Sequence, residues 1–162
     1  MVWFEHMSEK HRKEIIDLFN EYVENSFASF NYEKVDYGFY DEFMNSTRGY
    51  PRLAIMGEDG SVAGFAFLKP YHRTPDDRQV AEATCYLKPE YTRRGIGEML
   101  YRMIGKYCRL NGMKTMVAGV SSLNNPCLEF MKKLGFKQFD AYRGAGRKLG
   151  RFFDIVWLKK AL

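Results

Sequence analysis

A β-strand pattern that leads directly into an amphipathic helix dominates the middle of the chain. Residues 80–87, VAEATCYL, are rich in apolar and strand-favouring side chains, and Pro89 ends the run because proline lacks a backbone N–H. After a short turn, helical spacing of apolar residues predicts a helix over 96–110, which Gly112 follows at a usual helix end. The apolar face of this helix consists of Ile96, Leu100, Met103 and Tyr107. The unit requires a sheet with a helix packed on it.

The remaining elements are joined both by hairpins and by helices. GEDG, at 57–60, separates two apolar runs, and its Asp-Gly pair is typical of a hairpin turn. Helices are predicted after Ser8, over 37–45 and from Pro126, and strands over 2–6, 52–56, 61–69, 114–120, 136–143 and 151–158, with a loop at 144–150. This order implies an α/β fold with a mixed, mostly antiparallel sheet of about seven strands flanked by about four helices. Because no linker or repeat interrupts the pattern, residues 1–162 are expected to form one domain.

Residues 92–97, TRRGIG, have the chemistry of an anion site. The first N–H groups of a helix have no intrahelical acceptor, and the helix dipole adds partial positive charge there. Gly95 and Gly97 allow the backbone to approach a ligand closely, and Arg93 and Arg94 add full charges. Neither the P-loop pattern GxxxxGK[ST] nor the dinucleotide pattern GxGxxG matches. The alternative is a charged turn whose arginines are only solvated, so the turn alone leaves its function open.

The composition favours an anionic small molecule over nucleic acid as a ligand. The net charge is +5 and no block of like charges stands out, so an RNA-binding module ranks last. Three cysteines without paired spacing argue against a disulfide scaffold and against a zinc site, so no metal is expected. The first residues, MVWFEHMSEKHRK, have no apolar h-region, and no apolar run in the sequence approaches the length of a membrane span. A cytoplasmic protein without a membrane partner is therefore expected.

Between a strand and a helix, the TRRGIG turn resembles the [QR]xxGx[GA] signature of the GNAT superfamily of acetyl-coenzyme A-dependent N-acetyltransferases. Gly95 and Gly97 match, whereas Thr92 stands where the signature has Gln or Arg. A second family segment, an asparagine before a helix that ends LGF, matches Asn124 to Phe136. Further segments resemble, in order, the phosphinothricin N-acetyltransferase-like branch: FNEYVENSFASF, YPRLAI, VAGFAF, AEATCYL and AGRKLGRFFDIVW. The resemblance implies a GNAT fold, acetyl-coenzyme A as the acetyl donor, and small amino-acid analogues such as phosphinothricin or methionine sulfone as acceptors.

The resemblance also implies roles for residues of the strand at 80–87. Glu82 matches the family's general base, which takes a proton from the acceptor ammonium before its nitrogen attacks the thioester. The alternative for this carboxylate is a solvent-facing position on the strand. Cys85, Tyr86 and Leu87 would pair through their backbone with the pantetheine arm, as an added strand does. Cys85 is not favoured as a nucleophile, because no histidine or acid is spaced to activate it.

The turn at 92–97 and one asparagine complete the implied donor site. The turn would hold the pyrophosphate through its N–H groups and arginines, since Thr92 removes one side-chain contact. Asn124 matches the family asparagine that contacts coenzyme A, but it fits equally well as the cap of the following helix, a role for which Asn125 competes. The implied donor-binding residues are Cys85, Tyr86, Leu87, Thr92, Arg93, Arg94, Gly95, Ile96, Gly97 and Asn124.

The acceptor side departs from the branch in several places. Met131 stands where many superfamily members place a tyrosine, and this branch a histidine, as the acid for the leaving thiolate. Either the thiolate leaves without a protein acid, or another of the eleven tyrosines serves. The branch's Arg-x-x-Tyr is Thr74–Asp77 here, although Arg73 lies one place away as a candidate carboxylate clamp. His72 is expected at the surface. The candidate pocket residues are Phe27, Phe30, Tyr37, Tyr71 and Arg73.

The sequence thus predicts an N-acetyltransferase that moves an acetyl group from acetyl-coenzyme A to the primary amine of a small molecule. An amino acid or amino-acid analogue is the expected acceptor, and the resemblance alone suggests a homodimer. Two alternatives stay open. One is a non-catalytic acyl-coenzyme A-binding sensor, motivated by Thr92 and Met131. The other is an acetyltransferase for a polyamine or a peptide amine, to which Asp76 and Asp77 point as a means of attracting a cation.

Overall fold

The computed structural model describes residues 1–71 and 78–162 and has one mixed sheet as its centre. Seven strands are hydrogen-bonded in the order β1-β2-β3-β4-β5-β7-β6. Every neighbouring pair is antiparallel except β4 and β5, which are parallel. The strands are β1 (Trp3–His6), β2 (Arg52–Met56), β3 (Val62–Pro70), β4 (Val80–Leu87), β5 (Thr115–Ser121), β6 (Lys137–Lys148) and β7 (Arg151–Ala161). The mixed, mostly antiparallel sheet predicted from the sequence is confirmed.

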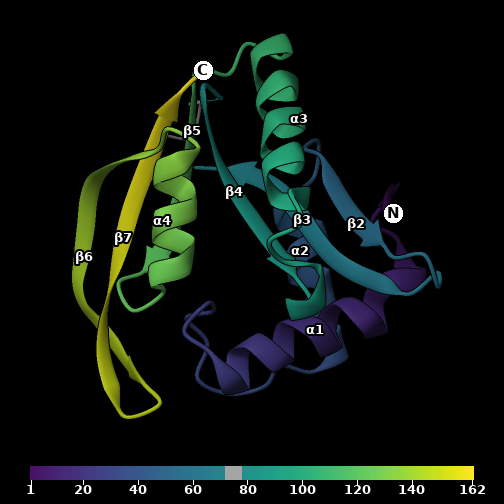
Figure 1. Ribbon diagram of the computed structural model, residues 1–162, viewed down its shortest axis with the longest axis horizontal. Coiled ribbons are helices and arrows are strands. Elements are labelled where there is room, and N and C mark those ends of the chain that lie inside the picture. Colours follow the sequence, from purple (N-terminus) through teal and green to yellow (C-terminus); the bar gives the residue numbers. More distant parts are fainter. Residues whose placement is uncertain (72–77) are drawn as a thin grey trace.

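Helices cover both faces of this sheet (Figure 1). On one face, α1 (Arg12–Asn25) and α2 (Tyr40–Ser46) pack with aromatic residues of β3. On the other, α3 (Ile96–Leu110) and α4 (Asn125–Lys133) bury an aliphatic core against β4, β5 and β7. Short 3₁₀ turns are η1 (Glu9–His11), η2 (Tyr37–Phe39) and η3 (Pro89–Tyr91). None of the helices in the described ranges has the length and apolar character needed to cross a membrane.

The sheet opens between β4 and β5. These two strands pair over only three positions, from Val80 opposite Thr115 to Glu82 opposite Val117. On its other side β4 stays paired with β3 as far as Leu87 opposite Gly64. Beyond Glu82, the described strands therefore leave the β5-facing edge of β4 unpaired. An unpaired edge with backbone N–H and C=O groups can accept an extended ligand as an additional strand.

The predicted hairpin between the last two strands is confirmed, but its loop is shorter than the predicted 144–150, because strand pairing continues through most of that segment. β6 extends to Lys148, and Leu149 and Gly150 form the turn into β7, with φ values of 50° and 76°. A two-residue turn with positive φ at both positions matches the twist of a hairpin. The register shifts between Tyr142 and Gly146, a bulge that absorbs the extra residues. Glycine and charge in this segment therefore mark a bulge and a tight turn within one long hairpin (Figure 1).

Candidate active site

The pleat of β4 directs alternate side chains to the two helical layers. Ala81 and Ala83 belong to the core under α3 and α4, and Cys85 and Leu87 pack against it. Glu82 is offset from these positions by one residue, so its side chain is on the face covered by α1 and α2. The carboxylate and the edge of β4 that would meet a donor are thus presented at the same opening.

Glu82 forms an ion pair with Lys69. The two residues are cross-strand neighbours on β4 and β3, and the Lys69 Nζ is 3.0 Å from a Glu82 carboxylate oxygen. The Glu82 side chain is 14% exposed, so it is neither in the apolar core nor free in solvent. It also occupies the last paired position before β4 and β5 separate. A carboxylate placed this way can accept a proton from a group entering the opening.

Backbone groups of β4 point into the opening at alternate residues. The Lys88 N–H donates to the Ala63 carbonyl at 2.8 Å, which fixes the phase of hydrogen bonding between β3 and β4. By alternation, the Tyr86 backbone bonds to β3, while the Cys85 and Leu87 backbones face the β5 side. The Leu87 carbonyl already accepts a hydrogen bond from the Tyr22 hydroxyl. Of the three predicted strand residues, Cys85 and Leu87 therefore present backbone groups to a ligand.

The turn before α3 exposes backbone N–H groups. The Thr92 hydroxyl is used within the turn, where it donates a hydrogen bond to the Pro89 carbonyl at 2.7 Å. Arg93 and Gly95 have positive φ values of 60° and 80°. The Met99 N–H donates to the Gly95 carbonyl at 3.0 Å as the first bond of the helix, so the three N–H groups before it have no helical acceptor. A cradle of this kind suits an anion.

The two glycines of the turn have different roles. A Cβ added at Gly95 would meet no atom within 4 Å, so this side of the turn is open. A Cβ added at Gly97 would lie 3.0 Å from the Phe130 ring, so this glycine permits close packing of α3 on α4. Ile96 is buried and anchors the start of the helix. Arg94 lies over the Tyr91 ring, 5.5 Å from its centroid.

Asn124 caps α4. Its Oδ1 accepts a hydrogen bond from the Cys127 N–H at 3.3 Å, and Pro126 lies in the first turn. Of the two roles left open for Asn124, the structure displays the cap. The coenzyme A contact stays a prediction. Asn125, the competing residue, is the first residue of the helix instead.

The segment after α1 bridges β4 and the end of the β6–β7 hairpin. The Tyr86 hydroxyl donates to the Ala28 carbonyl at 3.2 Å, and the Lys148 ammonium donates to the Ser29 carbonyl at 2.7 Å. Phe30 stacks on Phe153 with ring centroids 6.0 Å apart. Phe27, the other predicted pocket residue here, lies beneath the Arg151 guanidinium. The structure therefore brings both phenylalanines to the α1 side of the sheet, where they join the hairpin.

Tyr71 meets a residue that sequence reasoning missed. Its ring lies 5.4 Å from that of Trp157 on β7. A Cβ added at Gly119 would come within 3.0 Å of the Trp157 ring, so this glycine makes room for the indole beside the opening. Lys69 and Lys148 were missed as well. Only the register of an antiparallel β3–β4 pair could have indicated Lys69 as the partner of Glu82.

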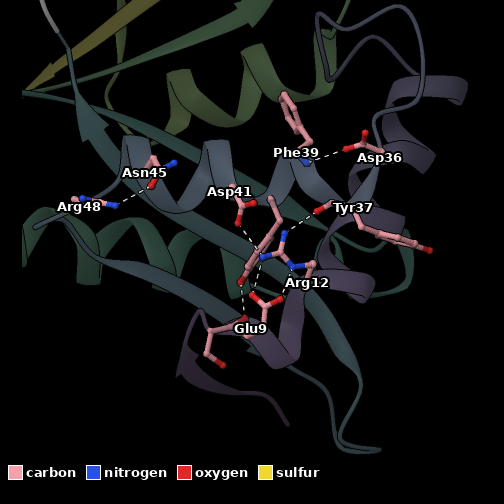
Figure 2. A network of polar contacts seen from close by, with 10 residues as sticks. Glu9, Arg12, Asp36, Tyr37, Phe39, Asp41, Asn45 and Arg48 are labelled. Carbon is pink, nitrogen blue, oxygen red and sulfur yellow. Dashed lines mark hydrogen bonds and ion pairs between the residues drawn. The ribbon is translucent and has the colours of Figure 1, made fainter.

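Tyr37 is not brought together with Glu82. Its carbonyl accepts a hydrogen bond from Arg12, which also pairs with Glu9 and Asp41, and its ring points away from that network (Figure 2). The Tyr37 hydroxyl donates to Asp17 at 2.8 Å on the exposed side of α1. Arg73 and His72, together with the segment Thr74–Asp77, lie outside the described residues.

The cysteines beside the opening are protonated at neutral pH. Burial raises the pKa of Cys85 to about 12 and that of Cys127 to about 11. A thiol is a poor nucleophile under these conditions, in agreement with the sequence-based expectation for Cys85. Within the described ranges, no group of three or more His, Cys, Asp or Glu side chains is arranged to hold a metal ion.

A sheet that opens between two parallel strands beside a glycine turn places the protein in the acyl-coenzyme A N-acyltransferase class of folds. The family model described as Acetyltransferase (GNAT) family matches residues 14–136. The chain belongs to this family and is an acetyltransferase.

Two curated relatives are similar over most of the chain. Phosphinothricin N-acetyltransferase of Streptomyces coelicolor is 28% identical over 161 residues, which cover 95% of this chain and 92% of that protein. An L-methionine sulfoximine/L-methionine sulfone acetyltransferase of Pseudomonas paraeruginosa is 25% identical over 147 residues, covering 90% and 86%. Both similarities lie in the branch that the sequence motifs indicated.

A solved structure has the same fold. The GNAT superfamily phosphinothricin acetyltransferase of Sinorhizobium meliloti, determined in complex with AcCoA, superposes with a TM-score of 0.89. The identity is 22%, and the superposition covers 99% of this chain and 88% of that one. The predicted GNAT fold is confirmed.

Proposed function

We propose that the protein transfers an acetyl group from acetyl-coenzyme A to the α-amino group of a small amino acid or amino-acid analogue, with Glu82 as general base. The observation that carries this proposal is the position of Glu82. It lies at the last paired position before β4 and β5 separate, next to Lys69, on the face bounded by the segment after α1 and by the hairpin. The names of the relatives, which are acetyltransferases of amino-acid analogues, support the acceptor class.

The donor site fits acetyl-coenzyme A at two places. The unpaired edge at Cys85 and Leu87 suits an arm that carries amides, and the N–H groups from Ile96 suit a pyrophosphate. When bound, acetyl-coenzyme A would supply an activated acetyl carbonyl. The Cys85 and Leu87 N–H groups would stabilise the negative charge that develops on its oxygen. Arg93 and Arg94 would add charge, and no metal is needed for this arrangement.

The ion pair at Glu82 would help to deprotonate the acceptor. An entering ammonium would lie near the Lys69 ammonium, and like charges close together favour loss of a proton from one of them. The carboxylate at 3.0 Å from Lys69 is placed to receive that proton. A neutral amine results, and only a neutral amine has the lone pair needed to attack a carbonyl.

We extend the proposal to the organisation of the protein. Residues 1–162 would act as one catalytic domain and would pair as a homodimer through the β6–β7 hairpin, where Tyr142, Leu149 and Phe152 are exposed. The three free cysteines fit the reducing cytoplasm. Light scattering of Phe152→Lys beside the wild type tests the dimer, and an unchanged mass would exclude Phe152 from the interface.

Release of coenzyme A thiol in the presence of amino acids, methionine sulfone, polyamines and peptides tests the proposed acceptor class. Turnover confined to amino acids and their analogues is the expected result. Preference for polyamines or peptides would shift the acceptor class. Calorimetric binding of acetyl-coenzyme A without turnover of any amine would favour the alternative of a non-catalytic sensor, which Thr92 and Met131 suggest.

A further inference from the structure

A groove runs between α3 and α4 toward their C-terminal ends. It is lined by α3, by the end of α4 and by the last residues of β7, and its volume is about 210 Å³. We call it the α3–α4 groove. The proposed donor turn stands at the start of α3, and at about 1.5 Å per residue the helix carries Arg109 about 20 Å beyond Ile96. The far end of α3 and the end of β7 lie on the same side of the molecule (Figure 1).

The α3–α4 groove is rich in positive charge. Its charged lining consists of four cations and one anion, namely Arg102, Arg109, Lys133, Lys160 and Glu98. The Glu98 carboxylate is 2.6 Å from an Arg102 nitrogen, so it balances that cation. Arg109, Lys133 and Lys160 form no ion pair with any other residue in the described ranges. Uncompensated positive charges around one hollow create a potential that attracts an anion.

The ends of the two helices account for part of this charge. Arg109 is in the last turn of α3 and Lys133 in the last turn of α4, where the helix dipole favours cations. Lys160 reaches the same end of α4 from β7, since a Cβ added at Gly135 would be 3.6 Å from its Cε. The dipole explains single cations at helix ends, but it does not require a hollow between them.

Gly105 keeps the floor of the α3–α4 groove open. It is buried in the interior of α3, where glycine is less favourable than alanine. The nearest atoms to an added Cβ would be the Arg109 Nη1 at 3.7 Å and the Leu162 Cδ2 at 3.8 Å, which are ordinary contacts. At Gly97, by contrast, the Phe130 ring would lie only 3.0 Å from the Cβ. Close packing therefore explains Gly97, whereas space in the groove explains Gly105.

The lining defines the class of ligand. The Arg109 guanidinium can hold a carboxylate or a phosphate through two parallel hydrogen bonds, and the lysines add point charges. Met116 and Phe136 are buried and Tyr101 is half-buried, so the inner wall is largely apolar. The groove is smaller than the roughly 300–1,000 Å³ of sites for drug-sized ligands. These properties fit a small carbon skeleton that carries two negative charges.

We propose that the α3–α4 groove binds a small organic dianion, a dicarboxylate or a phosphate monoester. The charged groups of the ligand lie against Arg109, Lys133 and Lys160, and its skeleton packs on Tyr101 and Phe136. This is a second ligand site, separate from the proposed donor and acceptor sites, and binding there does not depend on acetyl transfer. Because the ligand connects α3, α4 and β7, it stabilises the folded protein.

Calorimetry with phthalate, phenyl phosphate and inorganic phosphate tests the site. At mildly alkaline pH the first two probes carry two negative charges on one aromatic ring, and comparing them distinguishes a carboxylate ligand from a phosphate ligand. One or both should bind once per chain, more tightly than inorganic phosphate and equally well when acetyl-coenzyme A is already bound. Displacement by one equivalent of acetyl-coenzyme A would place the anion in the donor site and overturn the proposal. Absence of binding by all three probes, or equal affinity for inorganic phosphate, would overturn it too.

Arg109→Met and Lys160→Met test the cations of the groove. Each should weaken binding of the tighter probe by about tenfold, because each removes a hydrogen bond between charged groups. Lys106→Met and Lys132→Met are matched controls, since they remove the same charge from α3 and α4 outside the groove. The controls should keep wild-type affinity. Equal losses in all four variants would assign binding to the overall charge of the protein and overturn the proposal.

Gly105→Ala separates ligand binding from folding. Alanine is the better helix former, so the unfolding temperature should rise. The added methyl group enters the floor of the groove and should weaken probe binding by about tenfold. A more stable variant that keeps wild-type affinity for the probe would exclude the groove as the binding site.

Discussion

The two sides of Glu82 are assembled from different parts of the chain. The proposed donor side, Cys85 to Gly97, is a continuous stretch in which backbone N–H groups would make most of the ligand contacts. The proposed acceptor side joins the segment after α1 to the end of the β6–β7 hairpin, and the bond from Lys148 to Ser29 spans 119 positions. On one side, local turn chemistry sets the geometry. On the other, docking of distant segments sets it.

This difference predicts different sensitivities to mutation. A site made of backbone groups tolerates a changed side chain, such as Thr92 in place of the Gln or Arg of the family signature. The Thr92 hydroxyl bonds inside the turn. A site made by docking depends on each contact that holds the segments together, among them Phe30 on Phe153 and Tyr71 on Trp157. Donor affinity and acceptor affinity should therefore respond to separate sets of substitutions.

Glu82→Gln is expected to have the largest effect, because Glu82 stands where the two sides meet. The amide keeps the size of the side chain but cannot accept a proton, so kcat at neutral pH should fall by about 10²- to 10⁴-fold. Affinity for acetyl-coenzyme A, measured by calorimetry, should be unchanged. Turnover equal to that of the wild type would remove Glu82 from the mechanism.

Gly95→Ala probes the donor side, with Gly60→Ala as a matched control. Both glycines have a φ of 80°, and an added Cβ meets no atom within 4 Å at either position. Both substitutions should cost about 1–2 kcal/mol of unfolding free energy through backbone strain. Only Gly95→Ala places a methyl group in the open cradle, so only it should weaken acetyl-coenzyme A binding, by about tenfold or 1.4 kcal/mol. Equal affinities in the two variants would exclude the turn from the donor site.

The local structure of the proposed donor side is what the sequence predicted well. Pro89 ends β4, Gly95 begins α3 with positive φ, and Gly112 follows its end, each for a reason that lies within a few residues. Glu82 was singled out because it matches the general base of the family that the sequence resembles, and a carboxylate on an apolar strand fitted that role. The order of strands and helices followed from short-range periodicity and was correct along the described ranges.

The contacts that build the proposed acceptor side were not predicted, because they join segments far apart in the sequence. The end of the hairpin was predicted as a loop, since its glycines and charges obscured the pairing of Lys148 with Arg151. Trp157 and Lys69 read as ordinary strand residues until the register of the sheet brings them beside Tyr71 and Glu82. Tyr37 was predicted as a pocket residue only because it is aromatic. In the structure its hydroxyl bonds to Asp17 on α1.

Lys148→Met tests whether docking of the hairpin serves the acceptor. Lys148 is 4% exposed, and methionine fills similar space without the bond to the Ser29 carbonyl. Loss of a hydrogen bond from a charged group should raise the KM for the amine by about tenfold, while affinity for acetyl-coenzyme A stays constant. Lys137→Met, at the exposed start of the same strand, is the control. A parallel loss of donor affinity would show that the two sides are not separate.

The smallest expected effect is on the pH dependence of stability. Burial lowers the pKa of Lys148 from its usual value of 10.5, so between its folded pKa and 10.5 the unfolded chain binds more protons than the folded one. Below that window, the folded protein carries the whole cost of burying the charged ammonium. As pH rises through the window this cost is lost, so the contribution of Lys148 to the free energy of unfolding increases. The pKa values of Cys108 and Cys127 are raised to about 11, so these thiols make stability fall as pH rises above 9. The wild type and the variant both contain them, so their contribution cancels when the two unfolding free energies are subtracted. Urea unfolding from pH 7 to pH 10 measures the free energy of unfolding of both proteins. The value for the wild type minus that for Lys148→Met should rise with pH. A constant difference would mean that the ammonium is as well solvated in the folded hairpin as in the unfolded chain.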